Sequence, residues 1–281
     1  MSPEAPTLAV VIPVFNGADS LRACVASVRA AAGTDPVPEI VVSDDGSTED
    51  MSSVFTELAD EGVTVVRDAT NRGPAAARNR GAAATAADWL VFLDSDDELA
   101  PGSIAALRPS LEPGVGLVRA AYANRSSPTE PGTRAFLAGT FAVRHRVFDT
   151  AGGYDEELRF SENSELLMRL GPALDSLDLQ SRDDDLILTL VRSVGQSRNY
   201  DAARMRAAIH ILDQHADHFA ADPHERATYE AIASVNASRT RQWSTARRYA
   251  WRAVRSEPGN PRSYARFGLS LLGPLGARRT S

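Results

Sequence analysis

The chain has 281 residues, of which 43% are hydrophobic and 24% charged, a composition that excludes extensive disorder and allows one large domain with an appendage. All 30 basic residues are arginine, which excludes chemistry that needs a lysine, such as a Schiff base or the lysine of a phosphate-binding P-loop. The formal net charge of −7 divides into −13 for residues 1–199 and +6 for residues 200–281, and this predicts two regions with different partners.

The N-terminal residues and the cysteine content bear on where the protein works. Residues 1–15 contain neither the basic start of a secretory signal nor a long apolar segment, so we expect a cytoplasmic protein. The single cysteine, Cys24, lies in a helical pattern, and we expect it to be a small buried residue without a catalytic role.

Apolar, β-prone runs alternate with helical patterns along the first half of the chain. They predict strands at residues 7–15, 39–47, 63–68 and 88–97, and helices at residues 20–31, 51–62 and 73–87. Strands that alternate with helices of this length are typical of βαβ units. We therefore predict an α/β fold with a Rossmann-like, mostly parallel sheet flanked by helices.

Acidic side chains follow two of the predicted strands at their carboxyl ends. Asp44 and Asp45 end one strand, and Asp94 and Asp96 end another. Because ligands of parallel sheets bind beyond the carboxyl ends of the strands, we expect both pairs at one rim. Oxygen ligands suit Mg²⁺ or Mn²⁺, which commonly bind one or two carboxylates and complete their shell with phosphate and water oxygens. The alternative is that these acidic turns cap the helices that follow them.

Four stretches of the sequence resemble the ordered motifs of a known family. They are VVIPVFN, VVSDDGSTED, NRGPAAARNRGAAATAADWLVFLDSDD and AGGYDEELRFSENSELLMRL, within residues 7–200. Together they are similar to the motifs of family 2 inverting glycosyltransferases, whose catalytic domain has the GT-A fold. The resemblance implies a sugar transferase that uses a UDP, GDP or dTDP sugar donor, a divalent metal, Mg²⁺ or Mn²⁺, and a hydroxyl acceptor.

The resemblance also implies a role for each matching residue. Asp45 would accept a hydrogen bond from the nucleotide base, and Arg78 would donate to the diphosphate unless it is only a solvated helix arginine. Asp96 would bind the metal, and Asp94 would bind the ribose or the outer shell of the metal. The full set implied for the nucleotide-sugar site is Pro13, Val14, Asn16, Asp44, Asp45, Arg78, Asp94 and Ser95.

The third motif departs from the family pattern at the general base. The family usually has an Asp directly after the motif's Glu, whereas here Glu162 is followed by Asn163, which cannot accept a proton. Glu162 or Glu165 is the candidate replacement, although Glu165 also has the spacing for an ion pair with Arg169 that would involve no chemistry. The alternative function is a nucleotide-sugar-binding pseudoenzyme or scaffold.

Residues 201–281 have helical periodicity throughout, broken by Asp-Pro, Glu-Pro-Gly-Asn-Pro and Gly-Pro signals. We predict a catalytic domain at residues 1–200 and a helical region at residues 201–281, in which residues 225–258 weakly resemble a tetratricopeptide-like repeat. His210, His215, His218 and His224 are interpreted as part of an exposed polar face instead of a metal site. The Ser-, Pro- and Gly-rich segment 122–134 is predicted to be a mobile lid.

The last part of the chain is strongly basic. Residues 239–281 contain ten Arg and one Glu, interleaved with aromatic residues. One hypothesis is peripheral contact with an anionic membrane surface, at its inner face, or with a lipid-phosphate acceptor. The competing interpretation is a solvated arginine face over an aromatic core. The sequence contains no recognised nucleic-acid module, so no nucleic-acid partner is expected.

Overall fold

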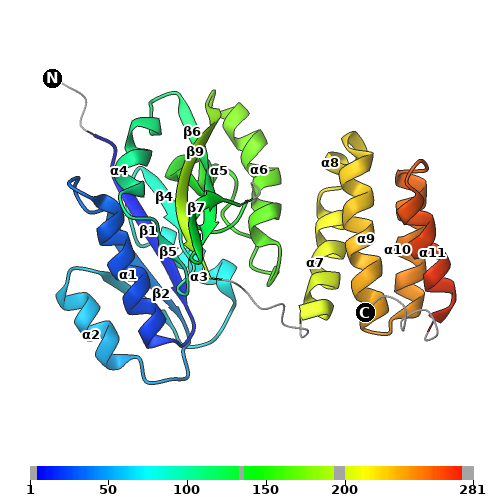
Figure 1. The fold of residues 1–281 in the computed structure, drawn as a ribbon, viewed down its shortest axis with the longest axis horizontal. Coiled ribbons are helices and arrows are strands. Elements are labelled where there is room, and N and C mark those ends of the chain that lie inside the picture. Colours follow the sequence, from blue (N-terminus) through cyan, green and yellow to red (C-terminus); the bar gives the residue numbers. More distant parts are fainter. Residues whose placement is uncertain (1–4, 133–135, 193–199, 274–281) are drawn as a thin grey trace. The chain divides into compact units, whose positions relative to one another are not determined.

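The computed structural model describes residues 5–132, 136–192 and 200–273 (Figure 1). The described residues form two compact units. Residues 5–157 and 162–192 make the first unit, and residues 158–161 and 200–273 make the second. The two units have different secondary structure, α/β in the first and all-helical in the second.

Parallel strands form one half of the sheet in the first unit. β1 (Leu8–Val14) lies between β2 (Glu39–Asp45) and β4 (Trp89–Phe92), and β3 (Thr64–Asp68) lies outside β2. All three pairings are parallel, so these strands end at one rim, as the alternating sequence pattern predicted.

The other half of the sheet is mixed. β8 (Phe141–Arg144) is antiparallel to β4 and to β6 (Val115–Asn124). β6 is parallel to β9 (Gln180–Val191), which pairs with the short β5 (Glu98–Leu99). β7 (Ser127–Pro131) forms a hairpin with β6, so most of the segment expected to be an irregular lid is regular strand. Residues 133–134 of that segment lie outside the described residues.

Helices cover both faces of this sheet (Figure 1). α1 (Ala18–Ala32), α2 (Ser52–Asp60) and α4 (Ser103–Leu107) share one buried cluster with the strands, and a short 3₁₀ helix (Arg108–Ser110) follows α4. α3 (Pro74–Ala82), α5 (His145–Thr150) and α6 (Glu162–Ser176) share the other. Successive residues of β1 divide accordingly, with Val10 in the first cluster and Val11 in the second. Burial on both faces explains the unbroken apolar run of β1.

The second unit consists of α7 (Asp201–Gln214), α8 (Ala216–Ala221), α9 (Pro223–Arg239), α10 (Trp243–Ser256) and α11 (Pro261–Leu271). Buried alanines such as Ala237 and Ala246 allow the helices to approach closely. The buried carboxylate of Glu230 binds Arg226 and Arg252 at 3.3 and 3.0 Å and accepts a hydrogen bond from Ser256 at 2.8 Å. This network joins α9 to α10.

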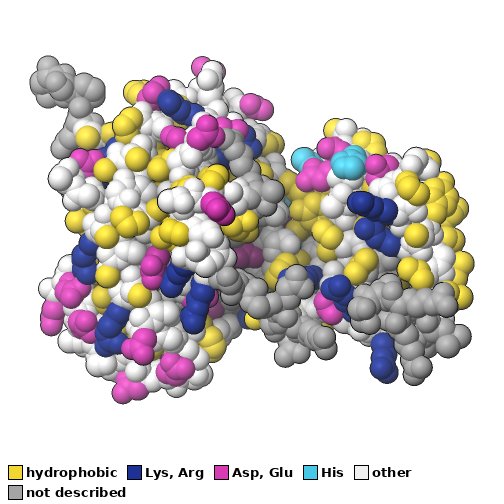
Figure 2. All heavy atoms as spheres, in the orientation of Figure 1, with side chains coloured by type: hydrophobic (Ala, Val, Ile, Leu, Met, Phe, Trp, Pro, Cys, Tyr) yellow, Lys and Arg dark blue, Asp and Glu magenta, His cyan; other side chains and the backbone are white. Residues whose placement is uncertain are grey.

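No helix among the described residues is both long and apolar enough to cross a membrane. Within this part of the chain, no group of three His, Cys, Asp or Glu side chains could hold a metal ion. His218 and His224 pair instead with Glu225 and Glu257. On the face of the second unit drawn in Figure 2, histidine side chains lie beside acidic ones.

Candidate active site

The loop after β1 is tied to the loop after β2 by Asn16. Its side-chain oxygen accepts hydrogen bonds from the backbone N–H groups of Thr48 and Glu49, at 2.9 and 3.1 Å. Asn16 has a positive φ of 63°, which asparagine tolerates better than most residues. Pro13 and Val14 precede it at the carboxyl end of β1, opposite Ser43 and Asp44 of β2. These predicted nucleotide-site residues therefore lie along the rim.

Two buried carboxylates end β2, and both have protein partners. Asp44 accepts from the backbone N–H of Ser47 at 3.0 Å and pairs with Arg67 at 2.9 Å. Asp45 accepts from the backbone N–H groups of Arg72 and Gly73 at 2.9 and 2.7 Å. Asp45 thus holds the loop that starts α3. Each of its oxygens has two lone pairs, so further acceptor capacity remains for a nucleotide base.

Arg78 on α3 joins two acidic segments that are far apart in the sequence. Its side chain is 2% exposed, and its two terminal nitrogens bind Asp94 at 2.6 Å and Glu162 at 2.8 Å. Burial alone would lower the pKa of Arg78, but the surrounding groups, above all the Asp94 carboxylate, raise it, so the guanidinium stays protonated. The alternative of a solvated helix arginine is wrong, because this charge is enclosed.

The turn after β4 contains the remaining acidic residues. Arg125, from the tip of the β6–β7 hairpin, donates to the backbone oxygen of Asp96 at 2.6 Å and pairs with Glu98 at 3.1 Å. The Asp96 carboxylate is exposed and has no hydrogen bond or ion pair with any described residue. Behind the turn, the buried Cys24 thiol donates to the backbone oxygen of Asp94 at 3.6 Å, as a structural role predicts.

The carboxyl group of Asp97 in this turn is affected by burial and by its acidic neighbours. Burial, together with the nearby Asp94 and Asp96 carboxylates, raises the pKa of Asp97 to about 7, although a hydrogen bond from the Arg192 backbone opposes the shift. Ser95 is half-buried between Asp94 and Asp96 in the same turn. Four acidic residues therefore share this turn, and among the described residues Arg78 and Arg125 form ion pairs with two of them, Asp94 and Glu98.

The two candidate bases have different surroundings at the start of α6. Both oxygens of Glu165 bind the guanidinium of Arg169, at 2.6 and 2.5 Å, and Arg169 also donates to the backbone oxygen of Gly153. The ion pair considered for Glu165 is thus present. Glu162 uses only Oε1, in its contact with Arg78. Between them, Asn163 accepts a hydrogen bond from the Tyr154 hydroxyl at 2.9 Å.

Comparison with known proteins assigns the fold and motifs to a family. Residues 9–158 match the sequence model described as "Glycosyl transferase family 2".

The chain belongs to glycosyl transferase family 2.

One relative of this family member is the succinoglycan biosynthesis protein ExoU of Rhizobium meliloti, 41% identical over 111 residues. The match covers 38% of this chain and 31% of that protein. The glycosyltransferase class expected from the motifs is thereby confirmed at the level of the family.

Two solved structures share the fold. Staphylococcus aureus TarS 1–349 in complex with UDP-GlcNAc matches with a TM-score of 0.62 and 16% identity, over 97% of this chain and 87% of that one. A mannosyltransferase from Pyrobaculum calidifontis, in complex with GDP-Man and Mn²⁺, matches with a TM-score of 0.59 and 19% identity, over 97% and 81%. The predicted GT-A-type sheet with a helical C-terminal region is confirmed; the domain boundary at residue 200 stays a prediction.

The turn after β4 fits a divalent cation that shares its ligands with a diphosphate. Such an ion needs only one or two protein carboxylates when phosphate and water oxygens complete its shell. Asp96 offers an exposed carboxylate without a partner among the described residues, and the Asp94 side chain is 42% exposed despite its contact with Arg78. Both are hard oxygen donors suited to Mg²⁺ or Mn²⁺. Their role as ligands stays a prediction.

Several residues at the rim were not found by sequence reasoning. Arg67 and Arg125 bind Asp44 and the turn after β4, and Arg80 donates to the backbone oxygen of Asp44 at 2.9 Å. Arg80 could have been suspected from the sequence, because it lies two residues after Arg78 in the same motif. No feature of the sequence pointed to Arg125, because the β6–β7 hairpin brings it to Asp96, which is 29 residues away in the chain.

Proposed function

We propose that this protein is a metal-dependent, inverting glycosyltransferase that moves a sugar from a nucleotide-sugar donor to a hydroxyl acceptor. The observation that carries the proposal is the contact of buried Arg78 with Asp94 and Glu162 at the rim where β1, β2 and β4 end. This contact joins the motif predicted to bind the donor to the motif predicted to supply the base. The nucleotide sugars bound to TarS and to the mannosyltransferase support a UDP- or GDP-linked donor; a dTDP-linked donor is the third candidate.

The donor would lie along the rim of the parallel strands. In this proposal the backbone at Pro13, Val14 and Asn16 lines the nucleotide, and Asp45 accepts a hydrogen bond from the N–H of the base. Asp44 holds the turn in which Asp45 lies, through its contacts with Ser47 and Arg67.

The diphosphate would lie beside Asp94, Ser95 and Asp96. A divalent ion bound by Asp96, with Asp94 in reach, would supply Lewis-acid stabilisation of the charge that develops on the diphosphate. Arg78 adds a protein cation that stays charged in the folded state and needs no reorganisation during the reaction.

We assign the general base to Glu162 in preference to Glu165. Deprotonation of the acceptor requires a carboxylate oxygen that can take up a proton, and only Oε1 of Glu162 is bound to Arg78. Both Glu165 oxygens are bound to Arg169. The acceptor proton would pass to Glu162 as the acceptor oxygen bonds to the anomeric carbon, and the bond from that carbon to the diphosphate would break on the opposite face.

A second candidate function is nucleotide-sugar binding without transfer. It is favoured by Asn163, whose side-chain oxygen is engaged by the Tyr154 hydroxyl at the position where the family usually has its base. The acceptor is not assigned by any contact described above. A cytoplasmic location, and contact of the Arg-rich region with a membrane surface or lipid phosphate, stay predictions.

The experiment that tests the donor site is thermal unfolding with UDP, GDP and dTDP, each with and without Mn²⁺. A nucleotide at about 100 times its Kd should stabilise the folded state by about 2.7 kcal/mol, and only with the metal. Asp96→Ala should abolish that shift. Asp60→Ala, which removes an exposed carboxylate at the end of α2, is the matched control and should preserve it.

Two outcomes would contradict parts of the proposal. If no nucleotide raises the melting temperature, with or without Mn²⁺, the proposed donor site is wrong. If a nucleotide binds, but the matching nucleotide sugar is neither hydrolysed nor used to glycosylate any acceptor that is offered, nucleotide-sugar binding without transfer is the better description of the function.

A further inference from the structure

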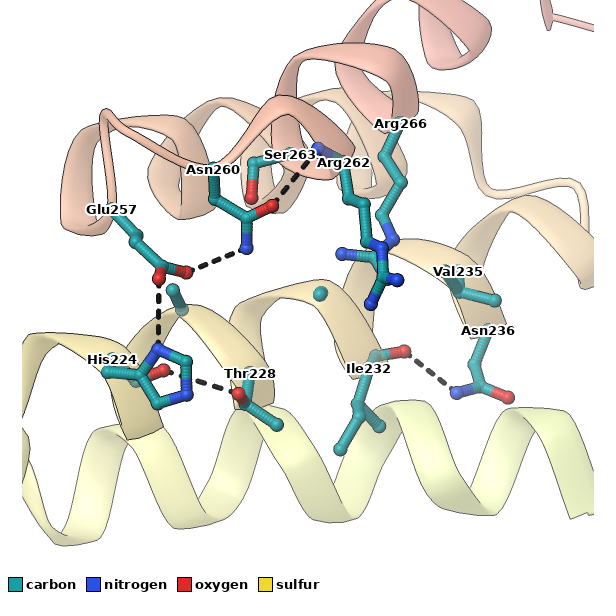
Figure 3. A pocket seen from close by; sticks show the side chains of 12 residues that line it. His224, Thr228, Ile232, Val235, Asn236, Glu257, Asn260, Arg262, Ser263 and Arg266 are labelled. Carbon is teal, nitrogen blue, oxygen red and sulfur yellow. Dashed lines mark hydrogen bonds and ion pairs between the residues drawn. The ribbon is translucent and has the colours of Figure 1, made fainter.

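The second unit contains a groove of its own, with a volume of about 430 Å³. Its floor is α9, and its other wall is formed by the α10–α11 connection and the first turns of α11. In Figure 3 the side chains of Arg262 and Arg266 extend from α11 into the space above α9. Nothing in the proposed transfer reaction uses this groove.

The groove has an excess of unpaired positive charge. The guanidinium groups of Arg262 and Arg266 make no hydrogen bond or ion pair with any described residue. The acidic residue of the groove, Glu257, is already engaged by His224 at 2.9 Å and by Asn260 at 2.8 Å. Arg226 and Arg252 of the same unit are instead neutralised by Glu230.

Part of the remaining lining is apolar. Ile232 on α9 is 38% exposed, which is high for a large aliphatic side chain, and Val235 is half-buried next to it. Asn236 is 5% exposed, and its amide nitrogen donates to the backbone oxygen of Ile232, so its polar atoms are enclosed and leave Ile232 and Val235 as the apolar contact surface.

The lining of the groove therefore suits one chemical class of ligand. The two guanidinium groups suit carboxylates, and Ile232 and Val235 suit an apolar side chain. A peptide with alternating acidic and apolar residues supplies both within one narrow segment. A phospholipid surface presents its anionic headgroups as a broad layer, which does not follow a concave groove of this size.

We infer that this groove binds an acidic, partly apolar peptide segment of another protein. Carboxylate side chains of the segment pair with Arg262 and Arg266, and its apolar side chains pack on Ile232 and Val235. The helical unit would thereby recruit a partner protein independently of the nucleotide site.

The test measures binding of a fluorescently labelled peptide in which Glu and Leu alternate, to the full-length protein without nucleotide, by fluorescence anisotropy. Wild-type protein should bind this probe and should not bind a peptide in which Gln replaces Glu. The double variant Arg262→Glu with Arg266→Glu should weaken binding by roughly tenfold or more, because each removed charge-assisted contact becomes a repulsion. Circular dichroism would verify that the variant remains folded.

The matched control is the double variant Arg247→Glu with Arg248→Glu. It changes the net charge by the same amount on α10, at residues that do not line the groove. Its affinity should stay within about twofold of wild type, at low ionic strength, where nonspecific attraction is greatest.

Three results would overturn the inference. They are absence of wild-type binding to the Glu–Leu peptide, equal loss in both double variants, and binding to anionic phospholipid vesicles that requires Arg262 and Arg266 while the peptide is not bound. The last result would assign the groove to a membrane surface. None of these measurements depends on nucleotide binding, so failure here is distinct from failure of the donor site.

Discussion

At the scale of single residues, Arg78 is the point where the motif proposed to bind the donor meets the motif proposed to supply the base. A buried guanidinium is tolerated because two carboxylates, Asp94 and Glu162, neutralise it at 2.6 and 2.8 Å. The Tyr154 ring also lies against it, 5.2 Å from the guanidinium carbon to the ring centroid. The same contacts orient Glu162 and involve only its Oε1, so the second oxygen is available for the proton transfer that we propose.

Substitution of Glu162 and of Asn163 separates the two proposed functions. Glu162→Gln should lower the rate of sugar transfer by roughly 10²–10⁴-fold, because an amide cannot accept the acceptor proton. Asn163→Asp retains an oxygen acceptor for the Tyr154 hydroxyl and should change the rate little. The measurement is transfer or hydrolysis of the nucleotide sugar identified by thermal unfolding. A large gain in Asn163→Asp, with no loss in Glu162→Gln, would exclude Glu162 as the base.

At the scale of secondary-structure elements, α3 lies against the sheet with almost no side-chain volume between them. Ala75, Ala76, Ala77 and Ala82 are buried in this helix, and Gly81 faces β1. A methyl group at Gly81 would lie 2.4 Å from Cγ1 of Val11. This approach holds Arg78, one turn earlier in α3, next to the ends of the strands.

Two helical glycines should therefore respond in opposite ways to replacement by alanine. Gly81→Ala should destabilise the protein by about 1–3 kcal/mol, since the added methyl overpacks the contact between α3 and β1. At Gly268 in α11, the added methyl would have no atom within 4 Å apart from its own helix backbone and chain neighbours, so Gly268→Ala should stabilise the protein by about 0.5–1 kcal/mol. Urea unfolding of each variant measures both changes. Equal effects in the two variants would show that the close approach of α3 has no energetic consequence.

At the scale of the whole molecule, each unit has its own source of stability. The first is built on two apolar clusters, one on each face of the sheet. The second combines alanine-rich helix packing with the buried Glu230 network. A nucleotide site in one and a peptide groove in the other would then respond to different ligands.

Hydrogen exchange measured by mass spectrometry should resolve these two contributions. Glu230→Ala should lower the free energy of opening, measured from amide exchange in α9 and α10, by about 2–3 kcal/mol. A larger loss is not expected, because the arginine partners of Glu230 are 39% and 33% exposed. Protection in β1–β4 should be unchanged. Glu225→Ala removes a half-exposed pair with His218 and should cost less than about 1 kcal/mol. Equal loss of protection in both units would contradict separate stabilisation.

Local sequence was enough to predict the parallel strands, the order of the helices between them, the family motifs and the helical nature of the C-terminal region. These features follow from local patterns, because side-chain periodicity and turn residues act over a few positions. The placement of Asp44, Asp45, Asp94 and Asp96 at strand ends was predictable for the same reason. Cys24 was correctly expected to be buried.

The pairing of charged side chains, in contrast, depends on how the chain folds. Arg78 and Glu162 are 84 residues apart, and no local pattern specifies that their side chains touch. The hairpin of β6 and β7 replaced an expected irregular segment because strand pairing satisfied its backbone, and it carried Arg125 to the turn after β4. The groove between α9 and α11 likewise exists only when the helices pack, since burial and the loss of solvent around a side chain depend on contacts between distant parts of the chain.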